Sequence, residues 1–342
     1  MSDRLVEVRD VSVVFHKKAL FKKTRSVEAV KSVSFGIDRG ETLGLVGESG
    51  SGKSTTGRAV LKLVPVASGD ITVGGQNLTD LNGRALRKAR RRMQMVFQDP
   101  YSSLDPSATV AASISEPLMV HDHVSARAAR ARALELIELV GLRASHADRY
   151  PYEFSGGQRQ RIAIARAIAL NPDFIVCDEA VSALDVSTQN QVINLLERLR
   201  TEFDLAYLFI AHDLAIVRHI SHRVAVMYLG RIVESGPAER VYNEPAHPYT
   251  QALLSAIPNP SPHRRADRRI VLAGEVPDPA RPPSGCPFRT RCAFAMDICA
   301  ERMPEHTAIN GGGEVACHLQ TSGPELSGAP LGDLTAAAIR RA

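Results

Sequence analysis

The sequence predicts an α/β fold, and three observations support that prediction. Short apolar stretches typical of buried strands, such as residues 42–46 and 174–177, alternate with stretches of helical pattern. A glycine-rich run lies directly between the first of these strands and the helix that follows it. Polar side chains stand where later strands end, which is where open α/β sheets collect ligand-binding residues. We therefore expect the functional site at the carboxyl edge of a sheet.

Composition limits the class of protein. The chain has 342 residues, which suggests two or three units, and it has a net charge of +5 and no Trp. The sequence contains no run of about eighteen apolar residues, the length needed to span a membrane. The first four residues also lack a signal pattern, so a cytoplasmic protein is expected. A basic run over 84–92 could contact nucleic acid or lipid headgroups, but no aromatic residues are interleaved with it. A solvated helix face is favoured, and no nucleic acid partner is expected.

Alternating apolar and polar residues over 4–38 predict an antiparallel sheet with a polar insertion at His16 to Ser26. An aromatic side chain of this region, Phe15 first and Phe21 second, could stack on a purine base. The alternative for either residue is a place in the core or in a hairpin.

The glycine-rich run fits a P-loop, a loop that binds phosphate between a strand and a helix. It reads Gly47-Glu48-Ser49-Gly50-Ser51-Gly52-Lys53-Ser54-Thr55. The glycines let consecutive N–H groups point inward, and the following helix N-terminus adds about half a positive charge. Lys53 would then reach the β- and γ-phosphates, and the Ser54 hydroxyl would hold Mg²⁺. A glycine-rich turn that binds nothing is the alternative.

Three predicted strands end in polar side chains: 93–97 before Gln98, 174–177 before Asp178 and Glu179, and 205–210 before His212. Adjacent residues on a strand point to opposite sides, so the two carboxylates need not share one role. Asp178 suits Mg²⁺ coordination, and Glu179 suits a base that polarises water. Gln98 could reach Mg²⁺ or the attacking water, and His212 the γ-phosphate; a surface amide and a structural histidine are the alternatives.

Helical pattern dominates residues 101–171. Ser125 is placed to cap a helix over 126–140, which Gly141 would end. A second helix start follows the run Ser155-Gly156-Gly157-Gln158, and it forms another candidate anion site. Beyond the strand 174–177, Ser182-Ala183-Leu184-Asp185 leads into an amphipathic helix to about Arg200.

This ordered set of motifs resembles the nucleotide-binding domain of ATP-binding cassette (ABC) proteins over roughly residues 4–240. The resemblance implies a RecA-like P-loop core with an antiparallel β subdomain and a helical subdomain at about 100–172. It also implies that two domains stack head to tail, so that the signature residues of one chain close over ATP held by another, with Asp185 in the D-loop between them. The ATP-binding set would be Phe15, Gly47, Ser49, Gly50, Ser51, Gly52, Lys53, Ser54 and Thr55, and the signature acting in trans would be Ser155, Gly156, Gly157 and Gln158. Phe154 replaces the Leu that is commonest at the first signature position.

Beyond Val241 proline becomes frequent, and we divide the chain into a nucleotide-binding domain (1–257), a C-terminal extension (258–320) and a tail (321–342) that should be disordered. The runs 244–250 and 99–106, with the later cysteines, resemble the ATPases of oligopeptide and dipeptide importers. That resemblance implies an ATPase on the cytoplasmic face of the membrane, two separate permeases contacted near 101–117, a second and paralogous ATPase, and an extracytoplasmic peptide-binding protein. Nickel complexes, glutathione or oligosaccharides are alternative cargoes. A non-transport ABC ATPase acting on nucleic acid or ribosomes is a further alternative.

Four cysteines near the end suggest a metal in a reducing compartment. Cys286, Cys292, Cys299 and Cys317 follow the spacing C-x5-C-x6-C-x17-C, which lacks the C-x2-C of ordinary zinc sites and selects no metal. Some peptide-importer ATPases hold a four-iron, four-sulfur cluster on such cysteines, so the resemblance implies a [4Fe–4S] cluster. Zinc and free thiols stay open as alternatives, with His306 and His318 as rival ligands.

Overall fold

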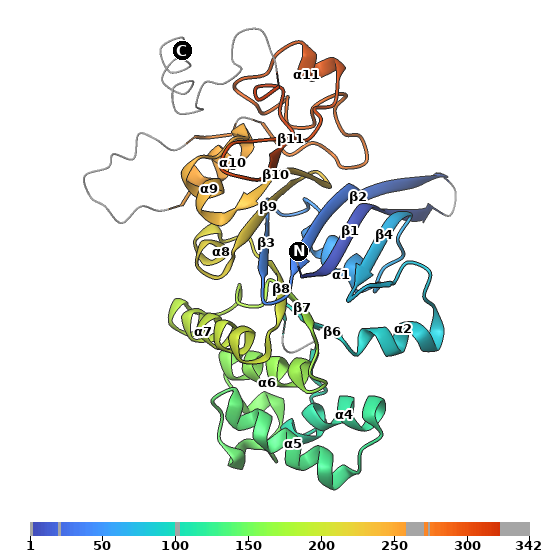
Figure 1. Ribbon diagram of the computed structural model, residues 1–342, viewed down its shortest axis with the longest axis vertical. Helices are drawn as coiled ribbons and strands as arrows, with labels where there is room; N and C mark the ends of the chain where they lie inside the picture. Colours follow the sequence, from blue (N-terminus) through green and yellow to red (C-terminus); the bar gives the residue numbers. More distant parts are fainter. Residues whose placement is uncertain (1–2, 20–21, 100–102, 258–269, 273, 322–342) are drawn as a thin grey trace, which may run out of the picture.

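The computed structural model describes residues 3–19, 22–99, 103–257, 270–272 and 274–321. Phe21, residues 258–269 and 273 of the C-terminal extension, and residues 322–342 of the tail expected to be disordered lie outside these ranges. In the described part, two sheets lie beside each other, the helices between residues 110 and 168 gather at one end of the molecule, and those beyond residue 237 lie toward the other end (Figure 1). The α/β class predicted from the sequence is therefore confirmed.

The smaller sheet is antiparallel and has the strand order β2-β1-β4-β5. Its strands are β1 Arg4–Ala19, β2 Lys22–Asp38, β4 Ser68–Val73 and β5 Gln76–Asn77. The polar insertion predicted at 16–26 is wrong, because the two strands continue to pair there, from His16 with Ser26 to Ala19 with Lys22. Backbone hydrogen bonds between strands need no apolar side chains, so the ladder extends past the point where the alternation of residue types stops.

The larger sheet has the strand order β11-β12-β10-β9-β3-β8-β7-β6 and forms the centre of the molecule. Its strands are β3 Thr42–Val46, β6 Met93–Val96, β7 Phe174–Asp178, β8 Ala206–Ile210, β9 Arg223–Tyr228, β10 Arg231–Pro237, β11 Thr307–Ala308 and β12 Glu314–Val315. The run β9-β3-β8-β7-β6 is parallel, and β10 and β12 join antiparallel at one edge. The C-terminal extension thus contributes strands to the same sheet as the glycine-rich loop.

Strands β7 and β8 separate two hydrophobic cores. Cys177 and Phe209 point into the core shared with the helices, whereas Val176 and Leu208 point into the core shared with the antiparallel sheet. This division follows from the two-residue period of a strand. It also explains why these strands read as continuous apolar runs, since both of their faces are covered.

Several of the helices begin at side chains that cap them. They are α1 Lys53–Val60, α2 Gly83–Arg90, α4 Val110–Asp122, α5 Ala126–Leu139, α6 Gly156–Ile168, α7 Val186–Phe203, α8 Leu214–Ile220, α9 Ala238–Asn243, α10 Pro248–Ser255 and α11 Ile298–Glu301, with short 3-10 turns at Ala144–His146 and Pro151–Glu153. Ser125 caps α5, as predicted, by accepting the N–H of Ala128, and Gly141 has φ +78° just beyond its end. Within the described ranges, no helix has the length and apolarity needed to cross a membrane.

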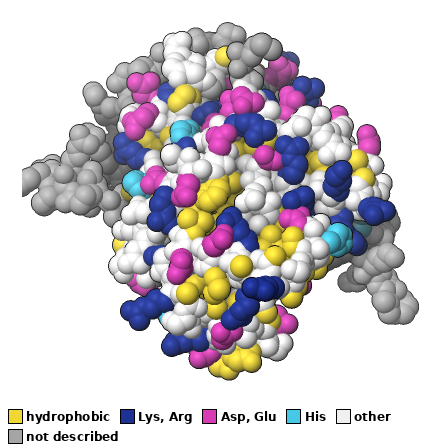
Figure 2. Space-filling view, turned by 60° about the horizontal axis from the view of Figure 1, so that its bottom comes forward, with side chains coloured by type: hydrophobic (Ala, Val, Ile, Leu, Met, Phe, Trp, Pro, Cys, Tyr) yellow, Lys and Arg dark blue, Asp and Glu magenta, His cyan; other side chains and the backbone are white. Residues whose placement is uncertain are grey.

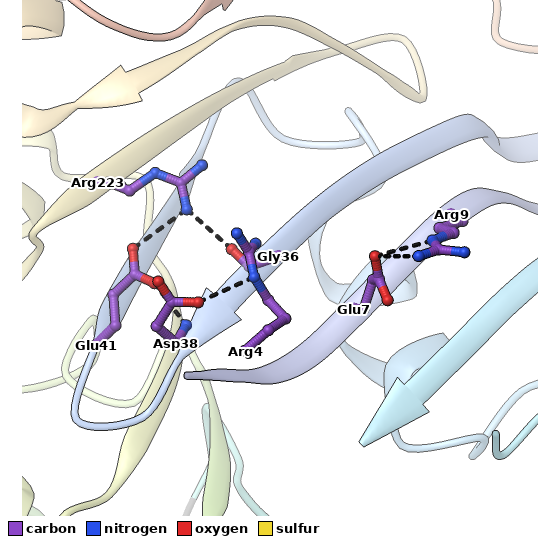
Figure 3. A network of polar contacts seen from close by, with 7 residues as sticks. All are labelled: Arg4, Glu7, Arg9, Gly36, Asp38, Glu41 and Arg223. Carbon is purple, nitrogen blue, oxygen red and sulfur yellow. Dashed lines mark hydrogen bonds and ion pairs between the residues drawn. The ribbon is translucent and has the colours of Figure 1, made fainter. Parts of the chain in front are cut away.

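A network of arginines ties the two sheets together (Figure 3). Arg223 on β9 donates to the carbonyl oxygen of Gly36 on β2 at 3.0 Å and to the Glu41 carboxylate at 3.3 Å. Arg4 pairs with Asp38 at 2.9 Å where β1 and β2 meet. These contacts fix the antiparallel sheet against the strand that follows it into the glycine-rich loop.

Candidate functional site

The glycine-rich loop between β3 and α1 has backbone angles that favour glycine. Gly47, Gly50 and Gly52 all have positive φ, and at Gly52 the value is +105°. A Cβ at Gly52 would lie 2.4 Å from the carbonyl oxygen of Ala29, and one at Gly47 would lie 2.1 Å from that of Met227. The loop therefore needs these glycines both for its curvature and for its fit against the two neighbouring strands.

Lys53 begins α1 and turns back into the loop. Its Nζ donates to the carbonyl oxygens of Gly47 at 2.8 Å and Glu48 at 2.9 Å, and only 5% of the residue is exposed. Burial lowers the pKa of Lys53, while Glu179 and Asp178 oppose that shift. The cation thus lies inside a loop of backbone N–H groups at a helix N-terminus, an arrangement that binds phosphate.

A hydroxyl and a carboxylate meet beside the loop. Ser54 Oγ donates to Asp178 Oδ1 at 2.6 Å, and Arg58 lies 3.6 Å from the other oxygen of that carboxylate. Burial raises the pKa of Asp178, while the hydrogen bond from Ser54 and the charge of Arg58 oppose the rise. Hydroxyl and carboxylate oxygens are the donors that Mg²⁺ takes beside a bound phosphate, so this pair fits the predicted magnesium site.

Polar residues from three adjacent strand ends meet at Glu179. Gln98 Nε2, after β6, donates to Glu179 Oε2 at 2.8 Å, and His212 Nδ1, after β8, lies 3.7 Å from the same oxygen. Glu179 itself has φ +48°, a conformation that is uncommon for a residue other than glycine. Its N–H donates to the carbonyl oxygen of Ile210 on β8, which holds that backbone in place. The structure therefore brings together the three residues for which catalytic roles were predicted.

The second glycine motif forms the start of α6. Ser155 Oγ accepts the N–H of Gln158, and Gln158 Oε1 accepts the N–H of Ser155, which makes a reciprocal cap. A Cβ at Gly157 would lie 2.1 Å from Cγ2 of Thr188 near the start of α7. Asp185 caps α7, and its bonds to Ser187 and Thr188 hold its pKa below the ordinary value. The motif and the Asp185 turn are thus packed against each other.

Phe15 has a partly exposed side chain. It is 42% exposed on β1 and pairs with Val27 on β2. Val27 lies two residues from Ala29, whose carbonyl oxygen abuts Gly52. Phe15 is therefore on the strand pair that borders the loop, and its ring is free of the core.

Three residues that contact this site were not anticipated from the sequence. Arg58 pairs with Asp178, Tyr249 accepts the N–H of Glu48, and Arg291 pairs with the Glu48 carboxylate. Arg58 lies one turn after Ser54 on the same helix, a spacing that could have indicated it. The other two come from more than 200 residues away and carried no local signal.

All four cysteines of the C-terminal extension are free thiols, and three of them are buried. Burial raises the pKa of Cys286, and it raises those of Cys292 and Cys317 to about 12. In the described ranges, no three His, Cys, Asp or Glu side chains are arranged to hold a metal ion. The iron–sulfur cluster expected from the sequence is thus without support from the arrangement of these thiols.

The fold and the site together define an ATP-binding cassette ATPase. The ABC transporter family model matches residues 30–182, and the model of the oligopeptide/dipeptide transporter C-terminal region matches residues 233–299. The oligopeptide transport ATP-binding protein AppF of Bacillus subtilis is 51% identical over 321 residues, which span 93% of this chain and 98% of that protein. The chain belongs to the family of ATP-binding subunits of oligopeptide and dipeptide transporters.

Two further relatives bear on the site and on the cargo. A solved dimeric ATP-binding cassette in a post-hydrolysis state, bound to ADP and Pi, superposes with a TM-score of 0.61 at 29% identity, covering 68% of this chain and 99% of that one. The glutathione import ATP-binding protein GsiA of Pectobacterium atrosepticum is 56% identical over 262 residues, which are 77% of this chain and 42% of that protein.

Proposed function

We propose that this chain is the ATP-hydrolysing subunit of an importer of dipeptides and oligopeptides, bound to separate permeases at the cytoplasmic face of the membrane. The observation that carries the proposal is the 51% identity to an oligopeptide transport ATP-binding protein over nearly the whole of that protein. The expected partners are two permeases, a second and paralogous ATPase, and an extracytoplasmic peptide-binding protein.

A pull-down of the tagged chain from gently solubilised native membranes tests this function. Mass spectrometry should identify two permeases, a second ATPase and a peptide-binding protein among the proteins that co-purify. Recovery of ribosomal or DNA-repair proteins without a permease would overturn the transport role.

In the proposed mechanism, the P-loop amides and Lys53 bind the phosphates, and Ser54, Gln98 and Asp178 are the candidate ligands of Mg²⁺. Mg²⁺ would supply neutralisation of charge on the phosphates when it is bound. Glu179 orients and deprotonates the attacking water, and His212 contacts the γ-phosphate. Gln98 donates a hydrogen bond to the Glu179 carboxylate and His212 lies close to the same oxygen, so both residues also hold that carboxylate in position.

We further propose that the ATP-binding site is completed by a second cassette, whose residues 155–158 close over the nucleotide. The start of α6 supports this because its N–H groups form an anion site separate in sequence from the P-loop. The solved cassette that resembles this chain is dimeric and carries ADP and Pi. Asp185, which packs near Gly157 through Thr188, would lie in the same interface.

A groove between α2, β6, α4 and α6 is the proposed permease contact. It has a volume of about 590 Å³, and its lining includes Leu63, Phe97 and Val120, large apolar side chains that are more than a third exposed. Figure 2 shows hydrophobic side chains gathered between charged ones on the face that brings this end of the molecule forward. Of the range 101–117, where the permease contact was expected, Ser103, Glu116 and Pro117 line the groove, and residues 101 and 102 lie outside the described part of the chain.

Substitution of the groove separates this contact from ATP binding. Val120→Asp should abolish co-purification of the permeases while ATP affinity stays unchanged, because a charge in an apolar contact is costly. Val124→Asp, on an exposed valine that does not line the groove, is the matched control. Equal permease recovery by both variants would place the contact elsewhere.

Glutathione is the second candidate cargo, and the 56% identity to a glutathione import ATP-binding protein favours it. Glutathione is itself a small peptide, so the motor role is the same for both cargoes. The ligand bound by the co-purified binding protein distinguishes them, because cargo is selected by that subunit.

We also propose that Cys286, Cys292, Cys299 and Cys317 hold a metal, a [4Fe–4S] cluster ahead of zinc. The first three pack into one hydrophobic cluster, and Cys317 packs into a neighbouring cluster that shares Met296 with it. No three of the described His, Cys, Asp or Glu side chains are arranged to hold a metal ion. The support for the proposal is therefore the chemistry of four reduced thiols in one region, which suits either metal. Anaerobic purification followed by iron, sulfide and zinc analysis tests the proposal, with Cys177→Ala as the control. Protein that lacks all three would end it.

A further inference from the structure

The C-terminal extension reaches the P-loop through an ion pair. Arg291 Nη1 donates to Glu48 Oε2 at 2.7 Å, and Nη2 donates to Glu48 Oε1 at 3.0 Å. The side chain of Arg291 is 7% exposed, and that of Glu48 is 26% exposed. Two parallel hydrogen bonds between a guanidinium and a carboxylate fix orientation as well as distance. The Glu48 hydrogen bonds raise the pKa of Arg291, so this cation stays charged.

A tyrosine from α10 holds the same loop residue by its backbone. The Tyr249 hydroxyl accepts the N–H of Glu48 at 2.8 Å, and Tyr249 is fully buried. The carbonyl oxygen of the same peptide unit, that of Gly47, accepts from Lys53 Nζ at 2.8 Å. The peptide between Gly47 and Glu48 is therefore held from both sides, by the phosphate-binding lysine and by a residue outside the motif.

The groups that hold Glu48 are themselves rigidly placed. The ring of Tyr249 packs against Tyr228 and Phe288, with centroids 4.7 and 5.4 Å away. The N–H of Tyr249 donates to His247 Nδ1 at 3.0 Å, and the N–H of His247 donates to Glu234 Oε2 at 2.9 Å. Phe288 lies three residues before Arg291, so the same aromatic cluster anchors both contacts to the loop.

The buried carboxylate at the far end of this chain of contacts is also paired. Glu234 is fully buried and accepts from Arg240 Nη1 at 2.5 Å. A buried charge that has its partner resists rearrangement, because breaking the pair would leave an uncompensated charge. The segment that carries Tyr249 is thus fixed relative to β10.

We propose that Arg291 and Tyr249 are positioning residues of the nucleotide site. They hold the peptide between Gly47 and Glu48 in the orientation in which Lys53 and the later N–H groups of the loop face the phosphates. Nucleotide affinity then depends on the docking of the C-terminal extension against the P-loop. This inference rests on the ATPase site and is independent of the cargo.

Nucleotide binding by the full chain tests the proposal without any permease. Calorimetric titration with the non-hydrolysable analogue AMPPNP and Mg²⁺ should show that Arg291→Gln weakens binding by roughly tenfold, the effect of a lost charge-assisted contact. Arg289→Gln is the matched control, because Arg289 lies two residues away and donates to Ser284 instead of the P-loop. Equal affinities of these two variants would overturn the role of Arg291.

Tyr249→Phe provides a second, milder perturbation. It removes the hydroxyl that accepts the N–H of Glu48 and keeps the ring against Tyr228 and Phe288, so the fold should be retained. Affinity should again fall severalfold, whereas Tyr242→Phe, whose hydroxyl donates to the carbonyl of Leu214, should leave it unchanged. Unchanged affinity in Tyr249→Phe would remove this residue from the proposal even if Arg291→Gln failed to fold.

A double-mutant cycle separates positioning from general stabilisation. If Arg291 acts through Glu48, then adding Arg291→Gln to Glu48→Gln should weaken AMPPNP binding no further. Arg291→Lys should restore part of the affinity, since it keeps the charge and loses the two-point contact. Fully additive losses in the cycle would contradict action through Glu48.

Discussion

His247 should make the stability of this protein fall between about pH 7 and about pH 5, and the size of the effect follows from its burial. The side chain is 1% exposed, its Nδ1 accepts the N–H of Tyr249, and its ring lies 5.7 Å from that of Phe288. Burial lowers the pKa of His247 from 6.5 to about 3 in the folded protein. The neutral ring is therefore the form that the fold requires.

The direction of the pH dependence follows from the pKa of His247 in the folded and in the unfolded state. Because the folded pKa lies below the unfolded one, the unfolded chain takes up a proton first as the pH falls. The free energy of unfolding therefore decreases from about pH 6.5 downward, and this contribution continues to grow until about pH 3. Between about pH 7 and about pH 5 the loss from His247 alone is about 2 kcal/mol.

Urea unfolding at the two pH values measures this loss, with His247→Asn as the comparison. Asparagine keeps a side-chain oxygen that can accept the N–H of Tyr249 at the start of α10, and it does not titrate. The wild type should lose about 2 kcal/mol more than the variant over this interval, since other acid-sensitive groups affect both proteins equally. Equal losses in the two proteins would refute the reasoning.

Three further predictions concern the nucleotide site. Glu179→Gln should bind ATP and lose about 10² to 10⁴ in turnover; steady-state hydrolysis within about threefold of wild type would remove Glu179 from the role of base. Lys53→Ala should weaken ATP binding by roughly tenfold to a hundredfold in a direct titration, and unchanged affinity would count against the P-loop. Gly52→Ala should also impair ATP binding, because its Cβ would lie 2.4 Å from Ala29, whereas Gly75→Ala, at positive φ in open space, should leave affinity intact.

The grouping of the catalytic candidates could be predicted because their residues mark the ends of strands. Gln98, Glu179 and His212 follow β6, β7 and β8, and the carboxyl ends of parallel strands lie at one edge of a sheet. The sequence did not contain the strand order, but the three side chains converge because β6, β7 and β8 are adjacent. Local signals likewise predicted the cap of α5, where Ser125 accepts an N–H of its own helix. The helix start near the second glycine motif was also predicted, but its cap by Ser155 was not.

Contacts between segments far apart in the chain could not be predicted. Glu48 lies 243 residues from Arg291 and 201 residues from Tyr249, and no periodic pattern links positions so distant. Strand β12 has only two residues, too few for an alternating pattern, although it pairs with β10 at the sheet edge. Extension of the hairpin beyond His16 was missed for a different reason, since the pairing of the two strands continues where the alternation of apolar and polar side chains stops.

These distant contacts change what the nucleotide site consists of. The motif supplies Lys53 on one side of the peptide between Gly47 and Glu48, and α10 supplies Tyr249 on the other. A chain cut at residue 257 would keep Tyr249 but lose Phe288, which packs on it, and Arg291, which holds the Glu48 side chain. Weak ATP binding by such a fragment would therefore combine lost packing with a lost ion pair, and only single substitutions in the full chain can assign the effect to the guanidinium.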